Sequence, residues 1–180
     1  MSDASRISSP SGAESQMVLR VPRGSLDAAL PPLEFDMKLV YLAENRLSET
    51  EFANVMTANS LGAVFNMASC QAANFSKKTS YELSKAKTLL KRREADLLID
   101  EWPAFMEEKK LNDSAAMRDA FLMKDKVYSD LTDRIDLLTA MEAFLKEKKG
   151  VFVRAYQQMK QLYASEKRDP TYVNPGDRHG

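Results

Sequence analysis

A block of positive charge lies in the middle of the sequence, between Ser76 and Arg93. The basic residues of this block accompany a single carboxylate, Glu82, although the formal net charge of the whole chain is zero. A local excess of this kind is either a solvated helix face or a surface that binds a polyanion. The basic residues are Lys77, Lys78, Lys85, Lys87, Lys91, Arg92 and Arg93.

The spacing of this block is helical. Polar residues recur at intervals of three, four and seven, which places them on neighbouring ridges of an α-helix. They are Lys77, Ser84, Lys85, Thr88, Lys91 and Arg92. A strip of ammonium and guanidinium groups suits phosphates, and Tyr81, one turn before Lys85, can stack on an unpaired base. We therefore predict that the basic block and Tyr81 contact nucleic acid, with a purely solvating helix face as the alternative.

Residues for catalysis or metal binding are scarce. The only histidine, His179, is next to last in the chain, and the only cysteine, Cys70, lies in a stretch of small apolar residues that predicts a packed thiol. Asp96 and Asp100 share a helix face, but no histidine accompanies them. No phosphate-binding glycine loop is present. We expect no enzyme activity, no metal and no cofactor.

Charge is segregated along the rest of the chain. Residues 94–113 are mainly acidic, and residues 146–168 are again mainly basic. These blocks leave open a second interpretation, a helical scaffold protein whose basic blocks pair with its own acidic connector in an assembly. The N-terminus has no apolar targeting segment and no run reaches the length of a membrane span, so we expect a cytoplasmic protein without membrane contact.

The fold class predicted from these patterns is all-α, with long helices that form a helical bundle or coiled-coil-like oligomer. Residues 1–30 are polar and aperiodic and predict a disordered arm, residues 31–166 a helical domain, and residues 167–180 a disordered tail. After two prolines, residues 33–47 predict a short amphipathic helix. Ser48 and Glu51 have the spacing of a capping box that opens a long helix, with a break conceivable at residues 74–79. No alternating run predicts a strand.

The second half of the chain predicts two more helices. Pro103 should end the long helix at Trp102, Asn112 or Asp113 should cap a short helix, and Asp125 should cap the last long one. Large apolar residues recur in that last helix every seven positions and predict a seam for oligomerisation with a partner helix. They are Leu131, Leu138, Leu145, Phe152 and Met159.

The region from about Tyr81 to Leu162 combines several features in order. They are a long helix ending in KAKTLLKRREADLLI, a Lys-Leu-Asn-Asp turn at residues 110–113, and a hinge at Lys124-Asp125. A long final helix with a Leu137-Leu138 pair and a lysine-rich turn follows. In these features the region resembles the bacteriophage UvsY family of recombination mediators. The nearest matches to the family's Lys-Ala-Arg-Leu motif are residues 85–87 and 90–93.

This resemblance implies a non-catalytic protein that binds single-stranded DNA in recombination and repair. It also implies two protein partners, the single-strand-binding protein that coats the strand and a RecA-like recombinase that the mediator helps to load. A ring-like homo-oligomer without a cofactor is implied as well. A phage-encoded member would act in the cytoplasm of the host cell.

Overall fold

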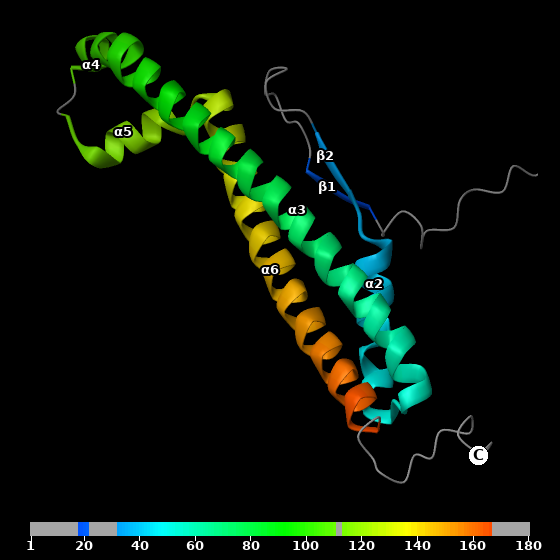
Figure 1. The fold of residues 1–180 in the computed structure, drawn as a ribbon. Helices are drawn as coiled ribbons and strands as arrows, with labels where there is room; N and C mark the ends of the chain where they lie inside the picture. Colours follow the sequence, from blue (N-terminus) through cyan, green and yellow to red (C-terminus); the bar gives the residue numbers. More distant parts are fainter. Residues whose placement is uncertain (1–17, 22–31, 111–112, 167–180) are drawn as a thin grey trace, which may run out of the picture. The chain divides into compact units, whose positions relative to one another are not determined.

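The computed structural model describes residues 18–21, 32–110 and 113–166 (Figure 1). The predicted tail at 167–180 lies outside these residues, as does the predicted arm at 1–30 except for residues 18–21. The described chain is mostly helical, which confirms the predicted class of long helices, while the predicted oligomer stays a prediction. The helices are α2 (Lys38–Asn45), a 3₁₀-helix (Leu47–Phe52), α3 (Val55–Asp96), a π-helix (Leu97–Glu101), α4 (Trp102–Lys109), α5 (Ala115–Leu122) and α6 (Lys126–Glu166).

A small sheet corrects the expectation that the chain has no strands. Strand β1 (Val18–Val21) pairs with β2 (Leu33–Asp36), and an ion pair of 3.1 Å joins Arg20 to Glu34. In β2, Leu33 and Phe35 are buried while their neighbours are exposed, which is the two-residue period of a half-buried strand. The short helix predicted from residue 33 therefore begins only at Lys38.

The start of α3 also differs from the prediction. The predicted capping box of Ser48 does not form, because this segment is the 3₁₀-helix and has no side-chain cap. Asn54 takes the role instead. Its Oδ1 accepts from the Thr57 N–H at 3.0 Å, and its own N–H donates to the Thr57 Oγ1 at 3.0 Å. From there α3 continues without a break through residues 74–79.

The predicted stop at Pro103 is wrong, because the backbone stays helical through it. Trp102 has φ −61° and ψ −43°, and its N–H bonds to the Leu97 carbonyl, five residues back. A proline in an ordinary α-helix clashes with the carbonyl four residues earlier. The wider π-turn accommodates Pro103, so the helical backbone continues from α3 through the π-helix into α4. The helix ends at Lys110, whose φ of 52° is left-handed.

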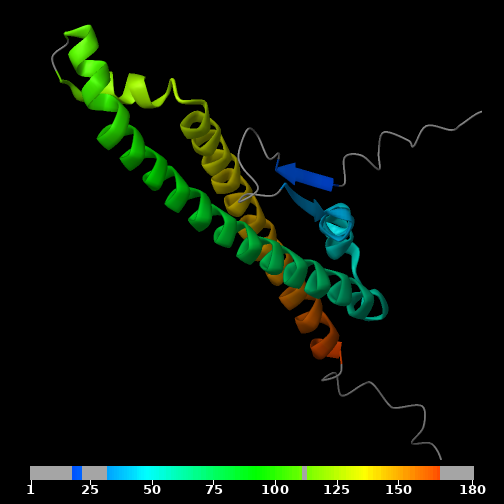
Figure 2. The ribbon, with the colours of Figure 1, turned by 90° about the horizontal axis from the view of Figure 1, so that it is seen from above.

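The remaining helix starts follow the prediction more closely. Ser114, rather than Asn112 or Asp113, caps α5, and its hydroxyl accepts from the Met117 N–H at 3.3 Å. Asp125 caps α6 as predicted, since its Oδ1 accepts from the Tyr128 N–H at 2.7 Å. Figure 2 shows α5 between the end of α4 and the start of α6.

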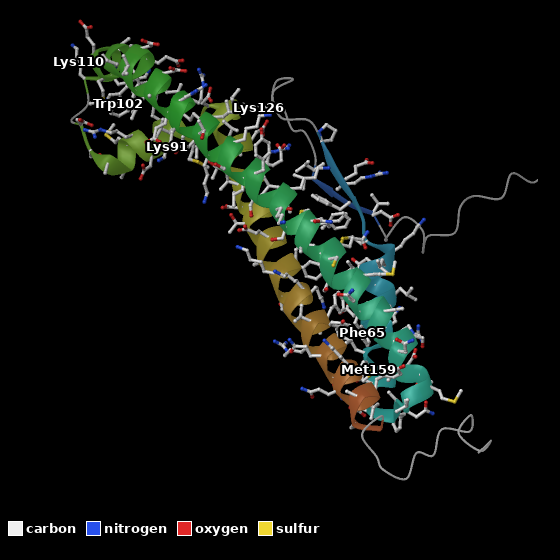
Figure 3. The ribbon with its side chains drawn as sticks, viewed as in Figure 1. Phe65, Lys91, Trp102, Lys110, Lys126 and Met159 are labelled. Carbon is white, nitrogen blue, oxygen red and sulfur yellow. The ribbon has the colours of Figure 1, made fainter. Side chains whose placement is uncertain are left out.

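The chain divides into two compact units. Unit 1 includes residues 34–71 and 151–166, and unit 2 includes residues 72–150, so α3 and α6 each contribute to both. The predicted single helical domain spans the two. In unit 1, Phe35, Val40 and Leu61 are buried, the rings of Phe65 and Phe152 stack with centroids 6.5 Å apart, and Met159 lies against Gly62 (Figure 3).

Unit 2 is an antiparallel helix pair closed by α4 and α5. Its α3 and α6 segments run side by side (Figures 1 and 2), with Leu83 and Ala86 of α3 and Leu138 of α6 buried. Three aromatic rings of α4 and α5 cluster at its end, with centroids 5.0 to 5.6 Å apart. They belong to Trp102, Phe105 and Phe121. This cluster fixes the connection between the two long helices.

Opposite charges are buried within the helix pair of unit 2. Glu82 of α3 is 8% exposed and Arg134 of α6 is 4% exposed. Burial lowers the pKa of Arg134, and the Glu82 carboxylate opposes this shift by electrostatic attraction. A buried charge that loses its counter-charge is costly, whereas an apolar replacement of both is not. The two residues therefore constrain the register of α3 on α6.

We predict that Arg134→Met alone lowers the free energy of unfolding by about 3–5 kcal/mol, because it leaves the Glu82 carboxylate buried without its counter-charge. The double variant Glu82→Leu/Arg134→Met should recover most of that loss. Urea denaturation of the two single variants and the double variant measures the coupling. Strictly additive effects would contradict an interaction between the two side chains.

Candidate nucleic-acid interface

The predicted basic strip lies on the outer face of α3 in unit 2. Thr79, Leu83 and Ala86 form the buried face of this segment, so the opposite ridge is exposed. Most of the predicted contact residues are exposed, Lys85 is half-buried, and Tyr81 is 67% exposed. The exposed ones are Lys77, Lys78, Tyr81, Lys87, Lys91 and Arg92. The helical spacing thus brings them to one side of one helix.

Four cations of this outer strip have no carboxylate partner within ion-pair distance among the described residues. They are Lys77, Lys85, Lys91 and Arg92. Their charges therefore face solvent, where phosphate groups can replace counterions. Tyr81 lies among them with its ring accessible for stacking.

Arg93 differs from its neighbours because it turns toward the start of α6. Its guanidinium donates to both carboxylate oxygens of Asp125, at 3.1 and 2.6 Å, and lies 3.7 Å from Glu101. The hydrogen bond to Asp125 is the main cause of the raised pKa of Arg93. Of the predicted contact residues, Arg93 is thus engaged within the chain in a bidentate pair.

A groove of about 430 Å³ runs along one flank of the α3–α6 pair in unit 2. From α3 it is lined by hydroxyl groups and two lysines, and from α6 by a carboxylate. The polar lining residues are Ser80, Ser84, Lys87, Thr88, Lys91 and Glu142. Ser80 donates a hydrogen bond to Glu142, and Lys146 forms an ion pair with the same carboxylate at 3.0 Å.

Sequence reasoning missed the α6 side of this groove. Glu142 and Lys146 have no unusual spacing within their own helix. They become part of the same site as Lys87 only because α6 packs antiparallel on α3. Pairing Arg93 of α3 with Asp125 at the start of α6 fixes how the two antiparallel helices align. That alignment was the one signal that could have placed Glu142 beside Ser80.

The predicted oligomerisation seam is buried within the single chain. Its five residues are at most 2% exposed. In unit 1, for example, the seam residue Phe152 stacks on Phe65 of α3. The seam therefore packs on the chain's own α3 and offers no free surface to a second copy.

Cys70, predicted to be packed, is exposed.

Among the described residues, no group of three or more histidine, cysteine, aspartate or glutamate side chains could hold a metal ion. None of the described helices combines the length and the apolar character that crossing a membrane requires.

Comparison with known proteins found no matching family model, no matching curated protein and no matching solved structure.

We predict that Asp125→Asn lowers stability at neutral pH by about 1–2 kcal/mol while preserving the helix cap, since asparagine caps equally well. The hydrogen bond from Arg93 lowers the pKa of Asp125. Its stabilisation is therefore present above the ordinary aspartate pKa near ~4 and is lost as the pH falls through the lower, folded value. Denaturation of both proteins from pH 7 to pH 2 measures this. A stability difference independent of pH would contradict the ion pair.

Proposed function

We propose that this protein binds single-stranded DNA without sequence preference through the outer face of α3, and that it acts as a non-catalytic recombination mediator. The observation that carries the DNA-binding part is the outer strip of Lys77, Lys85, Lys91 and Arg92, which has no ion pair within the described residues. A flexible strand can follow such a strip because its phosphates recur along the backbone.

Tyr81 favours a single strand over a duplex. Its ring is 67% exposed in the middle of the cationic strip. Stacking requires a base whose face is accessible, and bases in a duplex are already stacked on one another. Because every base has such a face, the contact is tolerant of sequence. A helix that combines this ring with lysines on both sides is thus suited to unpaired DNA.

The mediator part of the proposal rests on the resemblance to the UvsY family. A mediator acts on a strand coated by a single-strand-binding protein and helps a RecA-like recombinase to assemble there. Such a protein needs moderate affinity, because it must release the strand after loading. The proposed place of action is the cytoplasm, of the host if the chain is phage-encoded.

A homo-oligomer would multiply the effective concentration of the strips, and we propose the outer face of α3 in unit 1 as its interface. Residues 55–76 contain no charged residue, and Met56 and Met67 are 90% and 59% exposed. A charge-free face can meet its own copy without like-charge repulsion, as a self-complementary interface requires. We propose this surface as the oligomer interface instead of the predicted seam, which is buried within the chain.

The scaffold alternative has one observation in its favour. Arg93 pairs with Glu101 of the acidic connector and with Asp125, as charge pairing within an assembly would predict. The two functions differ in what removal of the other cations does. A scaffold would lose subunits, whereas a DNA-binding protein would lose the strand.

We predict that Lys85→Gln/Arg92→Gln weakens binding to a labelled oligo-dT strand and reduces its salt dependence. Each neutralised phosphate contributes ~0.7 to the slope of log affinity against log salt for single strands, so the slope should fall by about 1.4. The control is Lys38→Gln/Lys126→Gln, which removes the same charge from exposed positions outside the strip. Equal losses in the two variants would contradict a localised interface. A change in particle mass without a change in DNA binding would favour the scaffold.

We predict that the wild-type protein has a solution mass of at least twice the 20.3 kDa of one chain and that Met67→Glu lowers it, because a charge is then buried in the interface. Light scattering measures the mass. Ile99→Glu is the matched control, since Ile99 is 72% exposed and lies in unit 2. Short-range cross-linking through the exposed Cys70 should join wild-type chains and Ile99→Glu chains, but not Met67→Glu chains. An unchanged mass for Met67→Glu would rule out this interface.

A further inference from the structure

Glu142 occupies an unusual position for a carboxylate, because the groove around it is built of groups that bind anions. Its side chain accepts a hydrogen bond from the Ser80 hydroxyl and is 3.0 Å from the Lys146 ammonium. These two hydrogen bonds, followed by the attraction of Lys146 and Lys87, lower its pKa. Glu142 is thus an ionised internal anion at neutral pH.

The rest of the lining has unused capacity for another anion. Lys87 and Lys91 are one turn apart and exposed, and neither forms an ion pair within the described residues. Ser84 also lines the groove. A phosphodiester carries one negative charge and two free oxygens that accept charge-assisted hydrogen bonds from such donors. The groove of about 430 Å³ is open enough to admit it.

We propose that this groove is a phosphate subsite of the DNA interface and that Glu142 is the internal competitor that a strand phosphodiester displaces from Ser80 and Lys146. This inference rests on the proposed function. Lys91 borders the groove and also belongs to the outer strip, so a strand can pass from one to the other. The carboxylate repels the phosphate and offers its own oxygens to the same donors. Glu142 therefore limits affinity and favours release of the strand.

The test compares Glu142→Gln with Glu147→Gln in the full chain. Both changes remove one negative charge from α6, but the exposed Glu147 does not line the groove. Glutamine keeps the shape of the side chain and an acceptor for Ser80. In a fluorescence-anisotropy titration with labelled oligo-dT, we expect Glu142→Gln to tighten binding about five-fold, the effect of removing one partly screened repulsion. Glu147→Gln should change affinity less than two-fold.

A double-mutant cycle places the effect in the groove. In a Lys87→Gln background, the gain from Glu142→Gln should shrink, because the phosphate has lost the ammonium that holds it there. Repeating the titrations with millimolar inorganic phosphate distinguishes the two sources of the ligand. If the groove binds a phosphate of the strand, Glu142→Gln still binds oligo-dT about five-fold more tightly than wild type when free phosphate is present. If free phosphate abolishes this difference, the groove binds free phosphate instead and the proposal is overturned.

Failure of this inference differs from failure of the proposed function. If wild-type protein binds oligo-dT and Lys85→Gln/Arg92→Gln weakens it, but Glu142→Gln and Glu147→Gln behave alike, the subsite is overturned and the DNA interface stands. If wild-type protein does not bind oligo-dT at low salt, the proposed function is overturned, and the subsite with it.

Discussion

Burial of the apolar seam of α6 against α3 is the constraint on which the rest of the structure depends. Leu131, Leu138 and Leu145 are at most 2% exposed in unit 2, and each such side chain contributes roughly 1.5–3 kcal/mol relative to an exposed one. An α-helix can bury only one stripe of its surface against a single neighbour. The pairing thus decides which face of α3 turns outward, and the lysines and Tyr81 are on that face.

The same pairing divides the positive charge of α3 into cations with different tasks. Arg93, near the turn between the helices, is held by Asp125 and contributes to the fold. Lys87, on the flank, lies beside the Glu142 carboxylate of α6. Lys77 and Arg92, on the outer ridge, are available to phosphates. One helix therefore carries cations without an ion pair beside cations that face a carboxylate, as the proposed binding and release of a strand would require.

Local patterns were sufficient to predict much of the fold. The seven-residue repeat located the buried face of α6, and the Asp125 cap located its start, because both depend on residues close in sequence. The partner of the seam was not predictable, because a heptad pattern specifies a packing face without specifying which helix covers it. Strand β2 was missed because four residues with only Leu33 and Phe35 buried are too short a pattern. The helical continuation through Pro103 depends on a π-turn that residue types do not indicate.

The candidate site also has one part that the sequence predicted and one part that it did not. The α3 strip followed from spacing alone, whereas Glu142 joined it only through antiparallel packing, since it is far away in the sequence. Asn54 replaced Ser48 as a cap because its reciprocal hydrogen bonds with Thr57 start the helix beyond the 3₁₀ segment. Contacts between distant segments were the part that the sequence did not reveal.

The most direct test of the central claim is the affinity of the wild-type chain for labelled oligo-dT across a salt series. The account predicts binding at low salt whose log affinity falls linearly with log salt, with a slope that corresponds to several phosphates at ~0.7 each. Absence of binding at low salt, or an affinity that does not change with salt, would contradict the assignment of the outer face of α3 to DNA.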